Sequence, residues 1–240
     1  MYAGGKQVGV ASTSDRQSST AYINITKYRD WISATAAPAC DTEKSECTVT
    51  HMTKRGATLS TSDARRDAVV DAAVAEFART GFHSTPISAV ATRAAISPAY
   101  VFKLFPGKVS LFVAALDRCY EQVVHALSNG AARAGDAEPE KILYEMGGAY
   151  ADLIADRNLL MLQVHAQSAA DTPEIADAVR RGLQRVTEFA RSRSGAPDDQ
   201  VQRFLAYGQL CHLITTLDLD THPGDWAAVL SAGIRHPGKN

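Results

Sequence analysis

Aromatic, cationic and small side chains stand close together between Pro98 and Lys108, and they are of the types that contact nucleic acid. Ala99 and Tyr100 can pack against a thymine methyl group, and Lys103 can reach a guanine edge or a phosphate. Lys108 stands where a helix is expected to begin, so its ammonium group would join free backbone N–H donors in an anion site. We therefore predict base contacts from Pro98, Ala99, Tyr100 and Lys103, and a phosphate contact from Lys108.

Two closely spaced helix starts would position these side chains. Thr85 and Ser97 are each followed by proline, which places a hydroxyl at an N-cap and a proline at the first helical position. The spacing predicts helices over residues 86–94 and 98–105, joined by a three-residue turn. Two such short helices bury little surface alone, so they need a third helix across them, and residues 62–80 have the apolar period to form it. This arrangement is a helix-turn-helix.

The composition is that of a globular protein with one sizeable domain or two small ones. The 240 residues are 45% hydrophobic and 21% charged, with a formal net charge of -1. Residues 62–118 hold seven basic and five acidic side chains, whereas residues 119–240 hold eleven basic and sixteen acidic ones. The basic segment agrees with one end of the protein touching a polyanion, although the excess of positive charge is small.

No targeting or membrane segment is predicted. No apolar run approaches the ~18 residues that a spanning helix needs, and residues 1–10 lack the apolar core of a signal peptide. We therefore expect a cytoplasmic protein without a membrane partner. The four cysteines, Cys40, Cys47, Cys119 and Cys211, lack metal-ligand spacing and are expected to be reduced packing residues.

The chain divides into four predicted segments, and the fold is expected to be all-α. Residues 1–59 are expected to be a disordered leader, or to precede a true translation start at Met52; both alternatives stay open. Residues 60–107 hold the helix-turn-helix domain, residues 108–234 form a helical bundle, and residues 235–240 are a tail. Helices of the bundle are predicted over residues 108–127, 139–156, 158–169, 173–193, 197–217 and 223–234, with a loop over residues 129–138.

Residues 62–116 resemble the TetR family of transcriptional regulators, whose three-helix DNA-binding domain precedes a helical ligand-binding and dimerisation domain. The resemblance implies that Thr85 caps its helix and touches phosphate. It also implies an apolar backbone contact from Phe102, where the family usually has tyrosine. Ala95 and Leu104 depart from the family pattern, which often has glycine in the turn and histidine or tyrosine before the following phenylalanine. The matching residues are Thr80-Gly81-Phe82, Thr85, Ile87, Val90-Ala91, Ala94-Ala95-Ile96-Ser97, Phe102, Phe105, Lys108 and Leu111-Phe112.

The resemblance further implies a homodimer on a pseudo-palindromic double-stranded DNA operator, because each subunit would read one half-site. The last two long helices of the family pair between subunits. Here residues 198–217 and 223–234 correspond to them, and ordinary core packing is the alternative for their apolar side chains. The predicted interface anchors are Phe204, Leu205, Leu210 and Leu213.

The resemblance also implies that a small, moderately apolar effector binds the C-terminal bundle and shifts the helix that follows Lys108, which releases the DNA. No cofactor is expected. His165 is the strongest pocket candidate, because it lies in the most apolar helix and a buried imidazole needs a partner. The other candidates are polar or adaptable side chains on apolar helix faces, where core packing is the alternative: His125, Met146, Tyr150, Met161, Phe189 and His212.

Two other functions compete with this interpretation. His125, His165 and His212, with carboxylates nearby in the bundle, would suit an enzyme or a metal site, but their spacing fits no triad or ligand pattern. Catalytic residues and metal ligands are therefore not predicted. The second alternative keeps the fold without the ligand, as a ligand-independent regulator or a protein-responsive scaffold. Repression is the expected mode, and activation stays open.

Overall fold

A computed structural model describes residues 61–233 and residue 235, together with residues 2–3, 6–7, 9–14 and 20–24. The chain forms two compact units, residues 1–55 and residues 56–240. Most of the predicted leader, the candidate start at Met52 and two of the four cysteines lie outside the described residues.

The first unit contains two small antiparallel strand pairs, which the sequence interpretation did not predict. Strands β1 (Tyr2–Ala3) and β2 (Lys6–Gln7) form one pair. Strands β3 (Gly9–Ser14) and β4 (Thr20–Asn24) form the other, with an irregularity in register between Ala11 and Thr13. Strands this short carry too few alternating apolar residues to stand out in a sequence rich in Ser, Thr, Ala and Gly.

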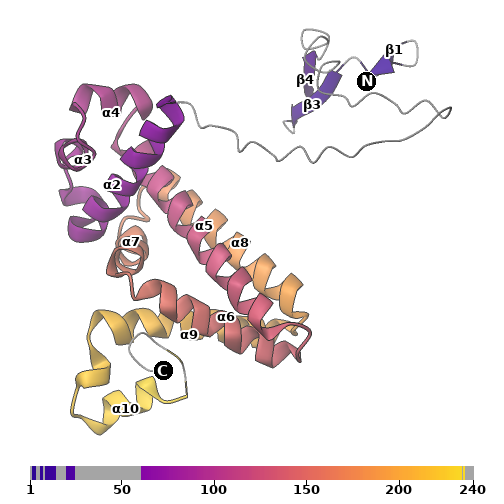
Figure 1. Cartoon of the computed structure of the whole chain (residues 1–240), viewed down its shortest axis with the longest axis vertical. Helices are drawn as coiled ribbons and strands as arrows, with labels where there is room; N and C mark the ends of the chain where they lie inside the picture. The colour runs from indigo at the N-terminus through magenta and orange to yellow at the C-terminus, as the bar shows by residue number, and fades with distance from the viewer. Residues whose placement is uncertain are drawn as a thin grey trace, which may run out of the picture. The chain divides into compact units, whose positions relative to one another are not determined.

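The all-α prediction is confirmed for the described part of the second unit, which contains nine α-helices and one 3₁₀ turn (Figure 1). Among these residues no single helix is long and apolar enough to cross a membrane; the bent pair Pro98–Leu104 and Lys108–Ala134 reaches that length and apolarity only when the two helices are taken together. The elements are α2 (Thr61–Ser84), α3 (Ile87–Arg93), α4 (Pro98–Leu104), α5 (Lys108–Ala134), α6 (Pro139–Ile154), α7 (Arg157–Ser168), α8 (Pro173–Ser194), α9 (Asp198–Thr216), η2 (Leu219–Thr221) and α10 (Asp225–Ser231).

The boundaries of α5 and α10 differ from the prediction. Helix α5 continues to Ala134, so the loop predicted over residues 129–138 is wrong for its first half. Gly130 suggested a break, but it is buried where α5 crosses α6, and a β-carbon there would lie 2.5 Å from the carbonyl oxygen of Glu145. The glycine therefore permits close helix packing. Helix α10 is only 7 residues long and ends at Ser231.

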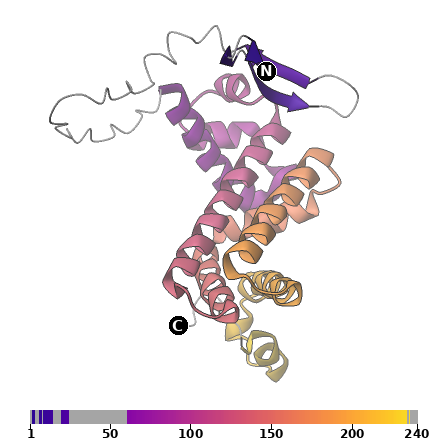
Figure 2. The same ribbon diagram turned by 90° about the vertical axis from the view of Figure 1, so that its right-hand side faces the viewer.

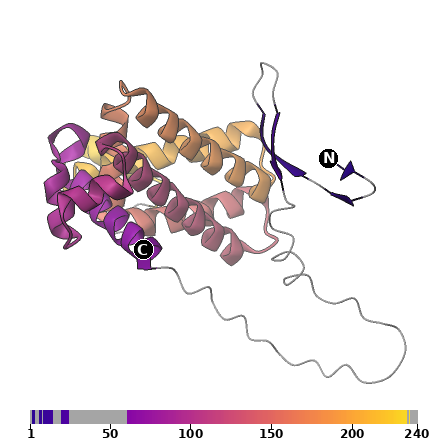
Figure 3. The same cartoon turned by 90° about the horizontal axis from the view of Figure 1, so that it is seen from above.

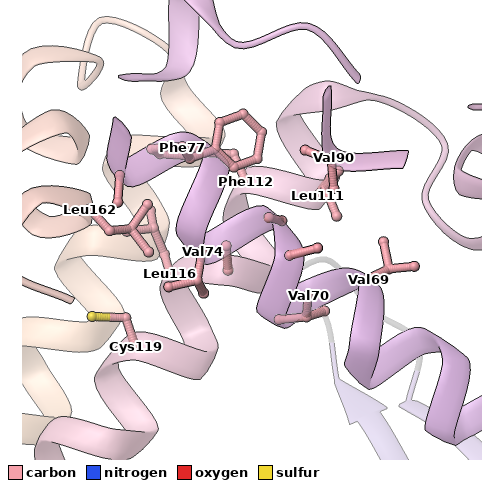
Figure 4. Close-up of a cluster of buried hydrophobic side chains, with 14 of the residues drawn as sticks. Val69, Val70, Val74, Phe77, Val90, Leu111, Phe112, Leu116, Cys119 and Leu162 are labelled. Atoms are coloured by element: carbon pink, nitrogen blue, oxygen red, sulfur yellow. The ribbon is translucent and has the colours of Figure 1, made fainter. Parts of the chain in front are cut away.

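The first hydrophobic cluster joins the helix-turn-helix unit to α5 and α7. Phe77 of α2 meets Phe112 of α5 edge to face, with ring centroids 4.8 Å apart. Leu116 of α5 and Leu162 of α7 are fully buried in the same cluster, and Figure 4 shows them beside each other below the two rings. Because α2 shares this core with α5 and α7, a displacement of α5 or α7 would also displace the helix-turn-helix.

A second cluster packs side chains of α5, α6, α8 and α9 against one another. Helices α6 and α8 both pack along α5, as the view from above shows (Figure 3). The small third cluster, around Ile214, Leu219 and Ala227, packs α10 and η2 against the end of α9. Helix α10 and the helix-turn-helix lie at opposite ends of the second unit (Figures 1 and 2).

Candidate nucleic-acid interface and bundle cavity

Helix α4 is held in place from both ends. At its start, the Ser97 hydroxyl oxygen accepts a hydrogen bond from the Tyr100 N–H at 3.2 Å, which confirms the predicted N-cap. At its end, the Arg66 guanidinium donates to the Leu104 carbonyl oxygen at 2.7 Å and lies 4.1 Å from the ring centroid of Phe105, which is buried. Arginine from the first turns of α2 therefore fixes the direction of α4.

The outward face of α4 carries the residues that the sequence placed there. Pro98, Ala99 and Lys103 are exposed, Phe102 is 52% exposed, and Tyr100 is half-buried. None of these side chains is needed to fill the core. Their position on one exposed helix face is the geometry that a major-groove contact requires, and their individual base and backbone contacts stay predictions.

One cation at this face was missed by the sequence interpretation. The Arg65 guanidinium lies 5.9 Å from the ring centroid of Tyr100, and the Lys103 ammonium lies 6.0 Å from it. The ring thus lies near two cations, one from α2 and one from α4. No local spacing could reveal Arg65, because it is far from Tyr100 in sequence.

The turn before α4 contains backbone strain. Ala95 has φ 54°, in the left-handed region that glycine adopts most easily. The turn therefore does require the unusual conformation, and it tolerates the β-carbon of Ala95 at a cost of roughly 1 kcal/mol. The Ile96 N–H donates to the Ala91 carbonyl oxygen at 3.0 Å, which closes the turn.

The predicted roles of Thr85 are not supported by its position. Thr85 is fully buried, and its hydroxyl donates to the Gly81 carbonyl oxygen at 2.7 Å. Helix α3 begins after Pro86 without a side-chain cap. Gly81 has φ 77° and interrupts α2, which turns its carbonyl oxygen toward the following loop. The hydroxyl therefore closes this turn instead of facing a phosphate.

Lys108 makes two contacts that the sequence did not reveal. Its ammonium group donates to the His83 carbonyl oxygen at 2.9 Å and lies 5.1 Å from the ring centroid of Phe82. Partial burial lowers its pKa. At the start of α5, the Gly107 N–H is already bound by the Ser110 hydroxyl oxygen at 3.2 Å. Lys108 therefore ties the end of α2 to α5, and its phosphate contact stays a prediction.

Arg93 takes part in an ion pair within the helix-turn-helix unit. Its Nε donates to the Glu76 carboxylate at 2.7 Å, and Arg79 donates to the other oxygen at 2.9 Å. These hydrogen bonds, first from Arg93 and then from Arg79, lower the pKa of the Glu76 carboxyl, which is 6% exposed. Arg93 therefore joins α3 to α2.

The C-terminal bundle contains a partly open cavity of about 430 Å³ between α5, α6, α8 and α9. Its wall is mostly apolar and aromatic, with Gly147 and Gly148 on the α6 side and Gly208 on the α9 side. Arg235, beyond α10, completes the wall. The other lining residues are Tyr120, Val123, Leu127, Glu140, Leu143, Tyr144, Tyr150, Gln163, Leu183, Val186, Gln200, Arg203, Phe204, Leu205, Tyr207, Gln209, Cys211 and Gly233.

Of the seven predicted pocket residues, the structure places only Tyr150 in the cavity wall, with His212 behind it. Met146 and Phe189 pack in the second cluster, and Met161 packs against the first. His125 is exposed, with a ring nitrogen 3.5 Å from the Asn129 amide. These side chains have ordinary packing or surface positions, because neither an apolar helix face nor a lone polar residue reveals where helices separate.

His165 lies at the contact between α7 and α2 and not in the cavity. Its Nδ1 would be 3.1 Å from a β-carbon at Gly81, and its buried Nε2 has no hydrogen-bond partner among the described residues. The imidazole therefore covers the interruption of α2.

Tyr150, Gln163 and His212 form a buried hydrogen-bond chain with one defined direction. The Tyr150 hydroxyl donates to the Gln163 side-chain oxygen at 3.2 Å, and the Gln163 amide donates to the Leu159 carbonyl oxygen at 3.1 Å. The Tyr150 oxygen is also 2.5 Å from His212 Nε2. Since tyrosine has one proton, His212 must carry its proton on Nε2, which leaves the buried Nδ1 without a partner among the described residues.

This chain makes folding stability depend on pH. Burial lowers the pKa of His212 to about 4, whereas an unfolded histidine titrates near pH 6.5. Below pH 6.5 the unfolded state therefore binds more protons, and stability falls as the pH falls toward 4. We expect the titration of His212 to lower the free energy of unfolding by about 2 kcal/mol when the pH falls from 7.5 to 5. Urea unfolding at both pH values should show a smaller decrease in unfolding free energy for His212→Gln than for the unmodified protein. The control His125→Gln should show the same decrease as the unmodified protein.

The predicted dimer anchors have mixed environments. Leu213 is 55% exposed on α9, whereas Leu210 packs against the third cluster. Phe204 and Leu205 are partly buried and line the cavity. The end of α9 and helix α10 also expose Leu217, Trp226 and Val229.

The described residues contain no group of three or more His, Cys, Asp or Glu side chains that could hold a metal ion. Cys119 and Cys211 are free and buried, and burial raises the pKa of their thiols to about 12 and about 11. They are therefore protonated packing residues.

Comparison with known proteins points to one family. Residues 69–115 match the family model described as bacterial regulatory proteins, tetR family. The HTH-type transcriptional repressor KstR of Mycolicibacterium smegmatis is 27% identical over 175 residues, which are 71% of this chain and 85% of KstR.

Solved structures agree on the fold. The regulator FadR of Bacillus subtilis in complex with stearoyl-CoA is 17% identical and has a TM-score of 0.54, covering 70% of this chain and 99% of FadR. A TetR-family regulator from Agrobacterium tumefaciens is 15% identical and has a TM-score of 0.56, covering 71% of this chain and 94% of that protein.

Proposed function

We propose, since this chain belongs to the TetR family of transcriptional regulators, that it is a repressor released from its operator by a small, moderately apolar effector. It would bind a pseudo-palindromic operator as a homodimer in the cytoplasm. The observation that carries the effector proposal is the cavity of about 430 Å³ in the bundle that extends from the helix-turn-helix. Its size lies within the range of small-molecule sites.

The exposed face of α4 supports the DNA-binding part of the proposal. Tyr100, Phe102 and Lys103 lie outside the core, while Arg66 and the Ser97 cap fix the helix that carries them. A rigid helix that presents uncommitted side chains is suited to the major groove. The relative KstR is itself named as a repressor.

Helix α5 supports the coupling between effector and DNA. Its first half, at Leu111 and Phe112, packs in the core of the helix-turn-helix unit, and its second half, at Val123 and Leu127, lines the cavity. A ligand that prefers a shifted α5 would therefore favour a second position of α4. The fold accommodates such molecules, because the similar structure of FadR contains stearoyl-CoA.

Exposed apolar side chains support the dimer. Leu213, Leu217, Trp226 and Val229 are each more than half exposed on α9, on α10 or between them. Burying such a surface against its copy would be favourable, and two-fold symmetry would place two α4 helices on successive grooves.

The first test is binding to the DNA upstream of the protein's own gene in a salt series. We expect a dimer whose affinity falls steeply with salt, as phosphate contacts require. Binding no tighter than to unrelated DNA would contradict an operator at that position.

The second test concerns the cavity and uses Nile red, a neutral fluorophore. We expect Gly208→Leu, which places a side chain in the cavity wall, to weaken Nile red binding at least tenfold while operator binding persists. Equal Nile red binding by the variant, or none by either protein, would instead favour a ligand-independent regulator of the same fold.

A further inference from the structure

We infer that the effector is an amphiphile with one anionic end, a carboxylate or a phosphate, which Arg235 holds at the wall of the cavity while the apolar part lies inside. This inference rests on the proposed function of the cavity as the effector site. Its evidence is the position, the incomplete pairing and the surroundings of the Arg235 guanidinium.

Helix α6 provides a seat for the guanidinium. A β-carbon at Gly148 would overlap the terminal nitrogen of Arg235, so the missing side chain of this buried glycine is what admits the group. The Tyr144 ring centroid lies 5.7 Å from the guanidinium carbon. The Arg235 carbonyl oxygen also accepts a hydrogen bond from the Cys211 thiol at 3.3 Å. The residue is thus anchored to α6 and α9 beside the cavity.

The positive charge of Arg235 is only partly compensated. The nearest carboxylate, that of Glu145, is 3.7 Å away, which is beyond hydrogen-bond distance. The other oxygen of Glu145 accepts from the Lys141 ammonium at 2.7 Å, so two cations share this one carboxylate. The guanidinium makes no hydrogen bond to another described residue, so its planar set of N–H donors is available for a carboxylate or phosphate.

A second cation and an apolar wall complete the amphiphilic character of the site. Arg203 also lines the cavity, although it is bound to Asp199 at 3.0 Å and is mostly exposed. The apolar part of the wall comes from Val123, Leu143, Val186, Phe204 and neighbouring residues. A fully charged ligand would lose its hydration against these side chains, and a fully apolar ligand would leave Arg235 without its anion.

The test uses the full chain, with Nile red displaced by three ligands that share a ten-carbon tail: decanoate, decan-1-ol and decyltrimethylammonium. We expect decanoate to bind at least tenfold more tightly than decan-1-ol, because a charge-assisted hydrogen bond is worth roughly ten- to hundredfold in affinity. The cationic ligand should bind weakest.

Two variants locate the anion. Arg235→Gln should lower decanoate affinity about tenfold and leave decan-1-ol unchanged. Gly148→Ala should have the same effect, because its methyl group displaces only the end of a flexible side chain and does not disturb the fold. The control is Arg180→Gln, which removes an exposed arginine paired with Asp177 on α8.

The outcomes separate the two proposals. If Nile red binding depends on the cavity but decanoate and decan-1-ol bind equally, or if Arg235→Gln leaves their ratio unchanged, the anionic class is wrong and the effector site stands. If Nile red binding is unaffected by Gly208→Leu, the effector site itself is wrong and this inference fails with it.

Discussion

Replacing Tyr100 and Lys103 together by alanine is expected to weaken operator binding at least about thirtyfold, because each base-edge contact contributes roughly 1–3 kcal/mol. Both side chains lie on the outward face of α4, where Lys103 is exposed and Tyr100 is half-buried, so the fold should survive their truncation. If Lys103 contacts a phosphate, its loss should also reduce by about one the slope of the logarithm of the binding constant against the logarithm of the salt concentration, because one fewer counterion is released.

Fluorescence anisotropy with operator DNA and with a scrambled duplex would measure both effects. Helix α6 offers a matched control, because Tyr144 is exposed and the Lys141 ammonium lies 5.0 Å from its ring centroid. Tyr144→Ala with Lys141→Ala removes the same chemistry from the C-terminal bundle. A double variant of α4 that still binds the operator specifically, as the control should, would exclude α4 as the recognition helix.

The sequence predicted the face of α4 well because that face depends on local rules. The Ser97 cap sets the start of the helix, and the helical period separates buried Val101 from exposed Lys103. The observed contacts of Thr85 and Lys108 were not predicted, because their partners are backbone carbonyl groups at the end of α2. The carbonyl oxygens of Gly81 and His83 reach them only because α2 is interrupted at Gly81, and no periodicity reveals where a freed carbonyl will point.

The cavity could not be located from polar residues on apolar helices. His165 was the strongest candidate, yet it packs against Gly81 of α2. The available signal was the small residues, since Gly147 and Gly208 lie where side chains would otherwise fill the space and Gly148 admits the Arg235 guanidinium. Such glycines are ambiguous in a sequence, because Gly130 has the opposite role and lets two helices touch.

Because Gly130 lies where two helices touch, its substitution is expected to have a large effect on stability. Gly130→Ala is expected to lower the free energy of unfolding by roughly 2 kcal/mol. The added β-carbon would lie 2.5 Å from the Glu145 carbonyl oxygen and 2.7 Å from the Met146 Cα, so α5 and α6 must move apart. Such overpacking lowers the free energy of unfolding by up to about 3 kcal/mol, and the better helix propensity of alanine offsets about 1 kcal/mol of that loss.

Gly208→Ala is the matched control, because it makes the same change inside a helix where the nearest atom, Tyr150 Cε1, is 3.7 Å away. This distance is an ordinary van der Waals contact, so propensity should dominate and stability should rise by about 0.5–1 kcal/mol. Urea unfolding at pH 7.5 would compare the two variants. If both glycines gave the same change, backbone propensity alone would explain them, and the close crossing of α5 and α6 at Gly130 would be wrong. Opposite signs would show that the crossing is tight enough to exclude a single methyl group, which makes α6 follow any displacement of α5.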